Sequence, residues 1–101
     1  MESAELFVCW TMDCETIQTE SPATGGPATW ELAERSMRGY VQTLAARGHR
    51  ATLFLIPRLA EGLPELVREL GAGGADLGVH MHPQTTDLGY DAHLGQLPAQ
   101  T

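Results

Sequence analysis

The stretch Arg50-Ala51-Thr52-Leu53-Phe54-Leu55-Ile56 is almost continuously apolar and rich in residues that favour β-structure, and Pro57 ends it. A stretch of similar character precedes it at residues 5–12, and residues 76–82, which Pro83 ends, form a third expected strand. Continuous rather than alternating apolarity is typical of strands that are buried on both faces in a parallel sheet. We therefore expect three strands at these places, with the strands at 5–12 and 50–56 buried on both faces.

Helical patterns separate the three expected strands. Thr29 can cap a helix from about Trp30 to Arg47, and a second helix is expected over residues 63–70. Residues 84–101 carry the composition of a loop. The order β-loop-α-β-α-β predicts an α/β fold in which right-handed crossovers make the strands parallel.

Length and charge exclude several classes of protein. The 101 residues suffice for one small domain, and the formal net charge of −7 gives no positive field for nucleic acid. No apolar run approaches the ~20 residues of a membrane span. The acidic start of the chain lacks the basic region of a signal peptide, so we expect a cytoplasmic protein. Cys9 and Cys14 are expected to be reduced, and Cys14 to be packed in the core.

Chemically active side chains follow two of the expected strands. Asp13 and Glu15 end the first strand, and His80 and His82 end the third. Because parallel strands end at one rim and residues two apart share a face, the four side chains should converge. Carboxylate and imidazole ligands suit zinc, and also cobalt, nickel or iron. Solvated acidic caps and a surface histidine pair are the alternative interpretation.

Other candidate side chains are expected to lie elsewhere. His49 precedes a strand and should lie at the opposite rim, while Tyr90 and His93 belong to the expected terminal loop. Trp10 and Trp30 are expected in the core or in a cleft.

Three motifs together resemble the polysaccharide deacetylase (NodB-homology) superfamily. The string Thr11-Met12-Asp13-Cys14-Glu15 resembles the D-x-E form of its first motif. Residues 51–57 look like its second strand, and residues 76–83 look like its second motif. The motifs stand in the family's order and spacing over most of residues 6–98.

The resemblance implies roles for single residues. Asp13 matches the catalytic base that activates the attacking water, Glu15 a carboxylate metal ligand, and His80 the first histidine ligand. The family's second histidine commonly stands four positions later, where this chain has Gln84. Either His82 then supplies the second imidazole, or the site is incomplete or metal-free. The reaction implied is hydrolysis of an N-acetyl or O-acetyl group on a carbohydrate or related small substrate.

The family fold is a distorted (β/α) barrel of about twice this length, in keeping with barrel sizes in general. We therefore expect residues 1–101 to form the N-terminal part of a single deacetylase-like catalytic domain. An unpaired sheet edge would then favour self-association. The alternatives are a catalytically inactive fragment or small-ligand binding module, and a flavodoxin-like module. The last would need a glycine-rich turn directly after the first strand, whereas Gly25-Gly26 comes eleven residues later.

Overall fold

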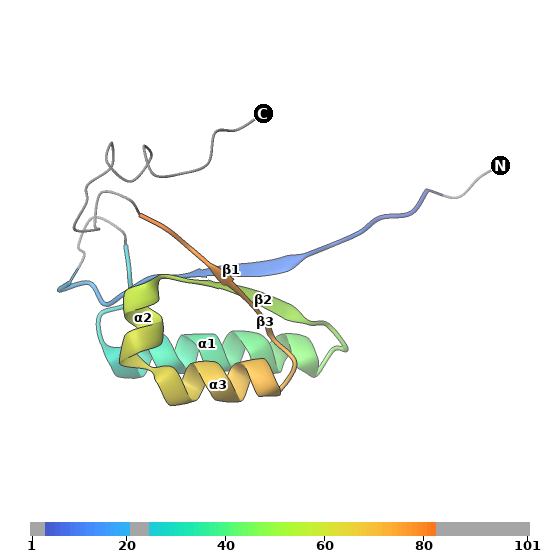
Figure 1. Cartoon of the computed structure of the whole chain (residues 1–101). Coiled ribbons are helices and arrows are strands. Elements are labelled where there is room, and N and C mark those ends of the chain that lie inside the picture. The colour runs from blue at the N-terminus through green and yellow to red at the C-terminus, as the bar shows by residue number, and fades with distance from the viewer. Residues whose placement is uncertain (1–3, 21–24, 83–101) are drawn as a thin grey trace.

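A three-stranded parallel sheet forms the centre of the protein (Figure 1). The computed structural model describes residues 4–20 and 25–82. The strands are β1 (Trp10–Cys14), β2 (Ala51–Leu55) and β3 (Asp76–Val79), and they lie in the order β1-β2-β3. The expected parallel α/β architecture is thereby confirmed.

Three helices lie on one side of this sheet (Figure 1). They are α1 (Trp30–Ala45), α2 (Pro57–Gly62) and α3 (Pro64–Ala72). The expected N-cap is confirmed, because the Thr29 hydroxyl accepts a hydrogen bond from the backbone N–H of Leu32 at 3.1 Å.

The core lies between the sheet and these helices. Leu53, at the middle of the central strand, is fully buried. The other members of the core cluster are buried small or apolar side chains: Cys14, Ala33, Met37, Leu55, Leu59, Leu66, Leu70 and Ala75. Burial of this apolar surface is the main force that holds the helices on the sheet.

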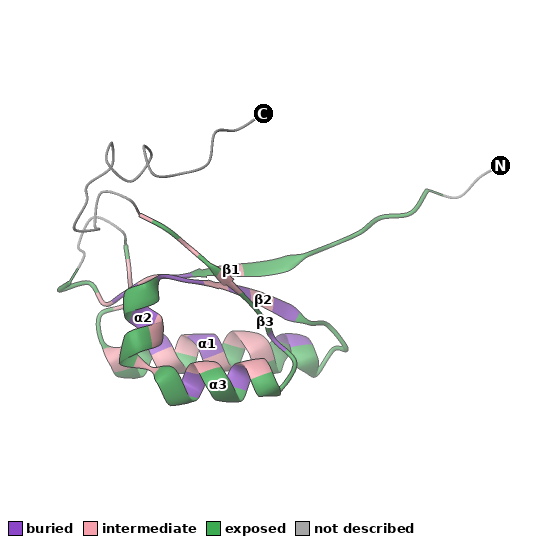
Figure 2. Cartoon of the chain, in the orientation of Figure 1, coloured by how far each residue is buried: buried purple, intermediate pink, exposed green. Residues whose placement is uncertain are grey.

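The strand register separates the two faces of the sheet. Met12 pairs with Leu53 on the helix side, whereas Asp13, Phe54 and Gly78 are neighbours on the other side. No described element covers that second face, and β1 and β3 are largely exposed (Figure 2). The expectation of burial on both faces is therefore wrong for β1. It holds for β2 only on the helix side, because Thr52 and Phe54 on the other side are half-buried.

The first strand begins later than the apolar run predicts. Residues 5–9 lie outside β1, and Leu6, Phe7 and Val8 are exposed. The physical reason is pairing: β2 begins at Ala51, which is the partner of Trp10, so earlier residues have no strand beside them.

Smaller differences concern the ends of elements. Helix α1 ends at Ala45 rather than Arg47, and β3 ends at Val79 rather than His82. Helix α2 was not expected, because Pro57 was interpreted only as the end of a strand. Proline also fits the first turn of a helix, where no N–H partner is needed, and Pro57 takes that role.

The described residues include no helix of the length and apolarity that a membrane crossing requires. Both cysteines are free. Cys14 is buried, as expected, whereas Cys9, in the stretch expected to be a buried strand, is exposed. Tyr90, His93 and the expected loop at 84–101 lie outside the described residues.

Candidate metal centre

The carboxyl ends of β1 and β3 carry the candidate site. Glu15 directly follows β1, and His80 directly follows β3. Backbone hydrogen bonds continue the ladder at this edge: Ile56 N–H donates to the Cys14 carbonyl at 3.1 Å, and His80 N–H donates to the Leu55 carbonyl at 2.9 Å. The central strand therefore fixes the backbone on both sides of the site.

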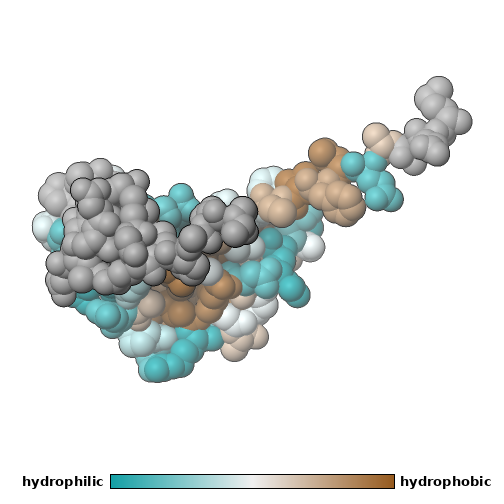
Figure 3. Space-filling model, turned by 45° about the horizontal axis from the view of Figure 1, so that its top comes forward, coloured by the Kyte–Doolittle hydropathy of each residue, from teal (hydrophilic) through white to brown (hydrophobic). Residues whose placement is uncertain are grey.

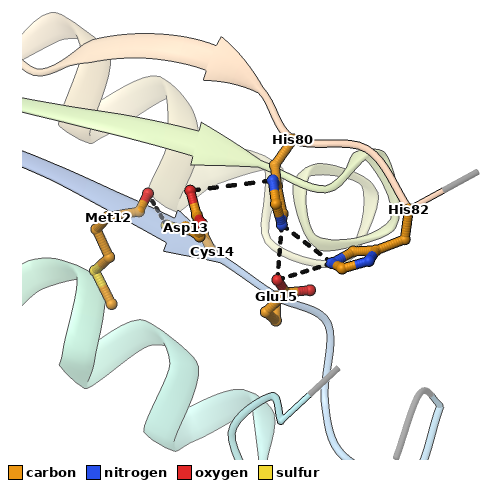
Figure 4. Close-up of polar contacts among 6 residues, drawn as sticks. All are labelled: Met12, Asp13, Cys14, Glu15, His80 and His82. Carbon is orange, nitrogen blue, oxygen red and sulfur yellow. Dashed lines mark hydrogen bonds and ion pairs between the residues drawn. The ribbon is translucent and has the colours of Figure 1, made fainter. Parts of the chain in front are cut away.

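Three side chains meet at this edge (Figure 4). Glu15 Oε1 lies 2.8 Å from His80 Nε2 and 3.0 Å from His82 Nε2. The two Nε2 atoms are 3.1 Å apart. Convergence at one rim was predicted for Asp13, Glu15, His80 and His82, and the geometry confirms it as a close cluster for the last three.

The donor set fits a divalent cation. The three contacts among Glu15 Oε1 and the two Nε2 atoms would need three hydrogens, but each Nε2 carries at most one. A single cation between the three atoms can instead accept a lone pair from each of them. Ligands at about 2.1 Å around a zinc ion lie roughly 3.0–3.4 Å apart. The separations of 3.0 and 3.1 Å fall within this range, and the Glu15–His80 separation of 2.8 Å is slightly shorter. Two imidazoles and one carboxylate also leave positions open for water or substrate.

Burial supports the same interpretation. The Glu15 side chain is only 14% exposed, and both histidines are half-buried. Glu15 Oε2 is buried and has no hydrogen-bond partner within the described part of the chain. A half-satisfied buried carboxylate is costly unless positive charge lies beside it.

Asp13 lies at the rim of this site. Its carboxylate is 63% exposed, and Oδ1 is 4.0 Å from His80 Nδ1 (Figure 4). His80 thus presents one ring nitrogen to Asp13 and the other to Glu15. Asp13 is close enough to act at the site, but it is not part of the three-atom cluster.

Cys14 points away from the triad into the core. Burial raises the pKa of its thiol to about 12, and the charges of Asp13 and Glu15 add to the effect. Its Sγ–H donates to the Met12 carbonyl at 3.7 Å. The prediction of a packed cysteine is therefore confirmed.

His49 lies at the other end of the sheet, with its ring 5.7 Å from that of Trp10. A cavity of about 270 Å³ opens there, lined by His49, Arg50, Gly74 and others. A smaller one of about 60 Å³ lies beside Glu15, between β1 and α1. The side chains that line the larger cavity do not form a set of metal ligands among the described residues. We therefore place the candidate site at Glu15, His80 and His82 and not at the larger cavity.

A network after Glu15 was missed by sequence reasoning. The hydroxyl of the buried Thr16 donates to Glu20 Oε2 at 2.8 Å. The Arg58 guanidinium donates to both Glu20 oxygens, at 3.0 and 2.9 Å. These hydrogen bonds, first from Arg58 and then from Thr16, hold the pKa of Glu20 below its usual value. Arg58 is 38 residues from Glu20, so no local pattern could have revealed the pair.

Gly26 was also missed as a site residue. A Cβ at Gly26 would overlap the Thr16 carbonyl oxygen and lie 3.3 Å from the Glu15 Cβ. Nearby, the Gln18 N–H donates to the Pro27 carbonyl at 2.7 Å. The glycine therefore lets the returning loop pass directly against the residues that carry the site.

No protein-family model matches this chain, and it matches neither a curated protein nor a solved structure. The chemistry of the site is therefore supported by the geometry of Glu15, His80 and His82 and by the motifs of the sequence.

Proposed function

We propose that the protein is a metal-dependent hydrolase of N-acetyl or acetyl ester groups, of the polysaccharide deacetylase type, and that it acts on a carbohydrate or related small substrate. The observation that carries the proposal is the mutual contact of Glu15, His80 and His82 at the carboxyl edge of a parallel sheet. Function concentrates at this edge in β/α proteins generally. The motif resemblance supports the reaction class.

The three cluster atoms would hold the cation: Glu15 Oε1 and the Nε2 atoms of His80 and His82. Zinc is the first choice, and cobalt, nickel or iron suit the same ligands. Such an ion polarises a substrate carbonyl and lowers the pKa of water.

Asp13 is the proposed base. Its exposed carboxylate lies at the rim, where it can accept a proton from an attacking water. Glu15 cannot take that role while its Oε1 contacts both imidazoles. A carboxylate near Nδ1 also favours the tautomer that leaves the His80 Nε2 lone pair facing the cluster.

We also propose that the three strands are consecutive strands of a (β/α) barrel. The order β1-β2-β3 is the one that a barrel requires, whereas a flavodoxin-like sheet has the order 2-1-3. In this arrangement the helices lie outside, and the face that carries Asp13, Phe54 and Gly78 lines the interior.

The net charge supports a proposal about the substrate, and the free cysteines support a proposal about the cellular compartment. The net charge of −7 favours a small-molecule or carbohydrate substrate over nucleic acid. The free Cys9 and Cys14 are consistent with the reducing cytoplasm, which is the location we propose.

Calorimetric titration with Zn²⁺ and Co²⁺ tests the metal site. We expect one ion per chain, and at least about a hundredfold weaker binding in Glu15→Ala, His80→Ala and His82→Ala, since losing a ligand costs more than losing a supporting residue. His49→Ala is the matched control and should bind normally, because His49 lies at the other end of the sheet. Equal binding by all four variants would overturn the site.

Acetate release from an acetylated chito-oligosaccharide tests the reaction. Asp13→Asn should lower turnover about 10²–10⁴-fold while leaving Co²⁺ affinity near that of the unaltered chain, because it removes a base and not a ligand. Metal binding without any acetate release would contradict hydrolase activity in these 101 residues and favour the alternative of a catalytically inactive fragment or small-ligand binding module.

A further inference from the structure

We propose that Arg58 is a positioning residue for the site. Through Glu20 and Thr16 it holds the segment that carries Glu15 against α2, and so it aims the Glu15 carboxylate at His80 and His82. The part of this proposal that concerns metal affinity rests on the proposed function. The part that concerns the Glu15–imidazole contacts does not, because those contacts exist among the side chains themselves.

The first link joins Glu15 to Glu20. Thr16, the residue after Glu15, is buried, and its hydroxyl donates to Glu20 Oε2 at 2.8 Å. The Glu20 N–H also donates to the Ile17 carbonyl at 3.0 Å, which closes the segment into a turn. A shift of Glu20 is thus transmitted to Thr16, and from there to the backbone of Glu15.

The second link joins Glu20 to the helical layer. Arg58 Nε and Nη2 donate to the two oxygens of Glu20 at 3.0 and 2.9 Å. This two-pronged geometry fixes direction as well as distance. Without it, the hydrogen bond between Thr16 and Glu20 would hold the segment only to itself and not to α2.

The third link fixes Arg58 itself. Its guanidinium lies 5.3 Å from the centre of the Trp30 ring, at the start of α1. Gly62, at the end of α2, leaves space for the same ring, since a Cβ there would lie 2.5 Å from it. Trp30 and α2 therefore hold Arg58 in place, and Arg58 joins the loop to both helices.

The experiment compares Arg58→Ala and Glu20→Gln with Arg68→Ala. Arg68 is the matched control, because it pairs with Glu65 on the exposed face of α3 and, within the described residues, makes no hydrogen bond to the loop. Ring-nitrogen chemical shifts of His80 and His82 are measured by NMR at one fixed pH without metal, with Glu15→Ala as the reference for lost contacts. Co²⁺ affinity is measured on the same samples, and circular dichroism confirms that each is folded.

We expect both Arg58→Ala and Glu20→Gln to move the ring-nitrogen shifts toward those of Glu15→Ala and to weaken Co²⁺ binding about tenfold, as the loss of a supporting residue does. Arg58→Lys keeps the charge but cannot donate from two nitrogens to the two Glu20 oxygens. It should show smaller changes than Arg58→Ala in both the ring-nitrogen shifts and the Co²⁺ affinity. Arg68→Ala should change neither.

Unchanged ring-nitrogen shifts in Arg58→Ala would overturn the positioning role. A change in Arg58→Ala with none in Glu20→Gln would also overturn it, because the route runs through Glu20. If the unaltered chain binds no Co²⁺, the proposed function fails, but the metal-free shifts still decide the role of Arg58.

Discussion

Glu15 Oε1 contacts Nε2 of both His80 and His82, so one carboxylate oxygen joins two residues that lie 65 and 67 positions away. Its D-x-E setting beside Asp13 is visible in the sequence. The features around it, Thr16 and Gly26, are not. Gly26 matters through its close approach to the Thr16 backbone, and the Thr16–Glu20 hydrogen bond matters through Arg58, which lies 38 residues beyond Glu20.

Gly26→Ala should disturb the site. The added methyl group would overlap the Thr16 carbonyl oxygen, so the loop must shift and Glu15 with it. We expect a loss of about 1–3 kcal/mol in the free energy of unfolding, as for other overpacked positions, together with weaker Co²⁺ binding. Urea denaturation and calorimetric titration measure the two effects.

Gly39→Ala is the matched control for this substitution. Gly39 lies in α1, and nothing lies within 4 Å of a Cβ placed there. Alanine is a better helix former than glycine, so the free energy of unfolding should rise by up to about 1 kcal/mol. A Gly26→Ala protein with normal stability and normal metal affinity would refute the close-approach argument.

At the scale of elements, an ion pair joins two helices. Arg38 on α1 donates to both oxygens of Glu69 on α3, at 2.7 and 2.8 Å. These hydrogen bonds, and then the charge of Arg38, hold the pKa of Glu69 below its usual value. Both side chains are partly solvated, so the pair orients the helices more than it stabilises them.

The lowered pKa sets a direction for pH dependence. A carboxylate with a lower pKa in the folded state contributes stability fully above its unfolded value, 4.5, and loses it as the pH falls through the folded value. Glu69→Gln should therefore be less stable than the unaltered chain at pH 7, by a small amount. The difference should shrink as the pH falls below 4.5.

Urea denaturation at several pH values checks this expectation. Glu65→Gln is the control, because it makes the same chemical change on α3 in a far more exposed pair within one helix. A difference between Glu69→Gln and the unaltered chain that stays constant with pH would contradict the proposed cause.

At the scale of the whole molecule, apolar side chains remain exposed on the edge strand β3 and on residues 4–9 before β1, the N-terminal arm. Val79 on β3 is 69% exposed and Phe7 is 85% exposed. Figure 3 shows apolar surface on the arm and on the body of the molecule. Among the described residues, nothing pairs with the outer edge of β3. Such an edge offers unpaired backbone groups to another chain.

We expect the 101-residue chain to self-associate through this edge despite its net charge of −7. Val79→Lys places a charge on the exposed edge and should lower the weight-average mass in light scattering at equal concentration. A clean monomer of the unaltered chain over the concentration range would contradict the expectation.

The sequence alone determined the fold class and the edge of the sheet at which the candidate site lies. Apolar runs, the Thr29 cap and the alternation of strand and helix are local signals, and parallel strands must end at one edge. These signals were enough to bring Glu15, His80 and His82 together in the prediction.

Only the tertiary structure decided where β1 begins, the order of the strands, and the contact of one Glu15 oxygen with two imidazoles. It also decided that Arg58 and Gly26 hold the loop. The physical reason is common to all of these: each depends on pairing or packing between distant segments, such as Trp10 with Ala51 or Glu20 with Arg58, and no local pattern encodes such a contact.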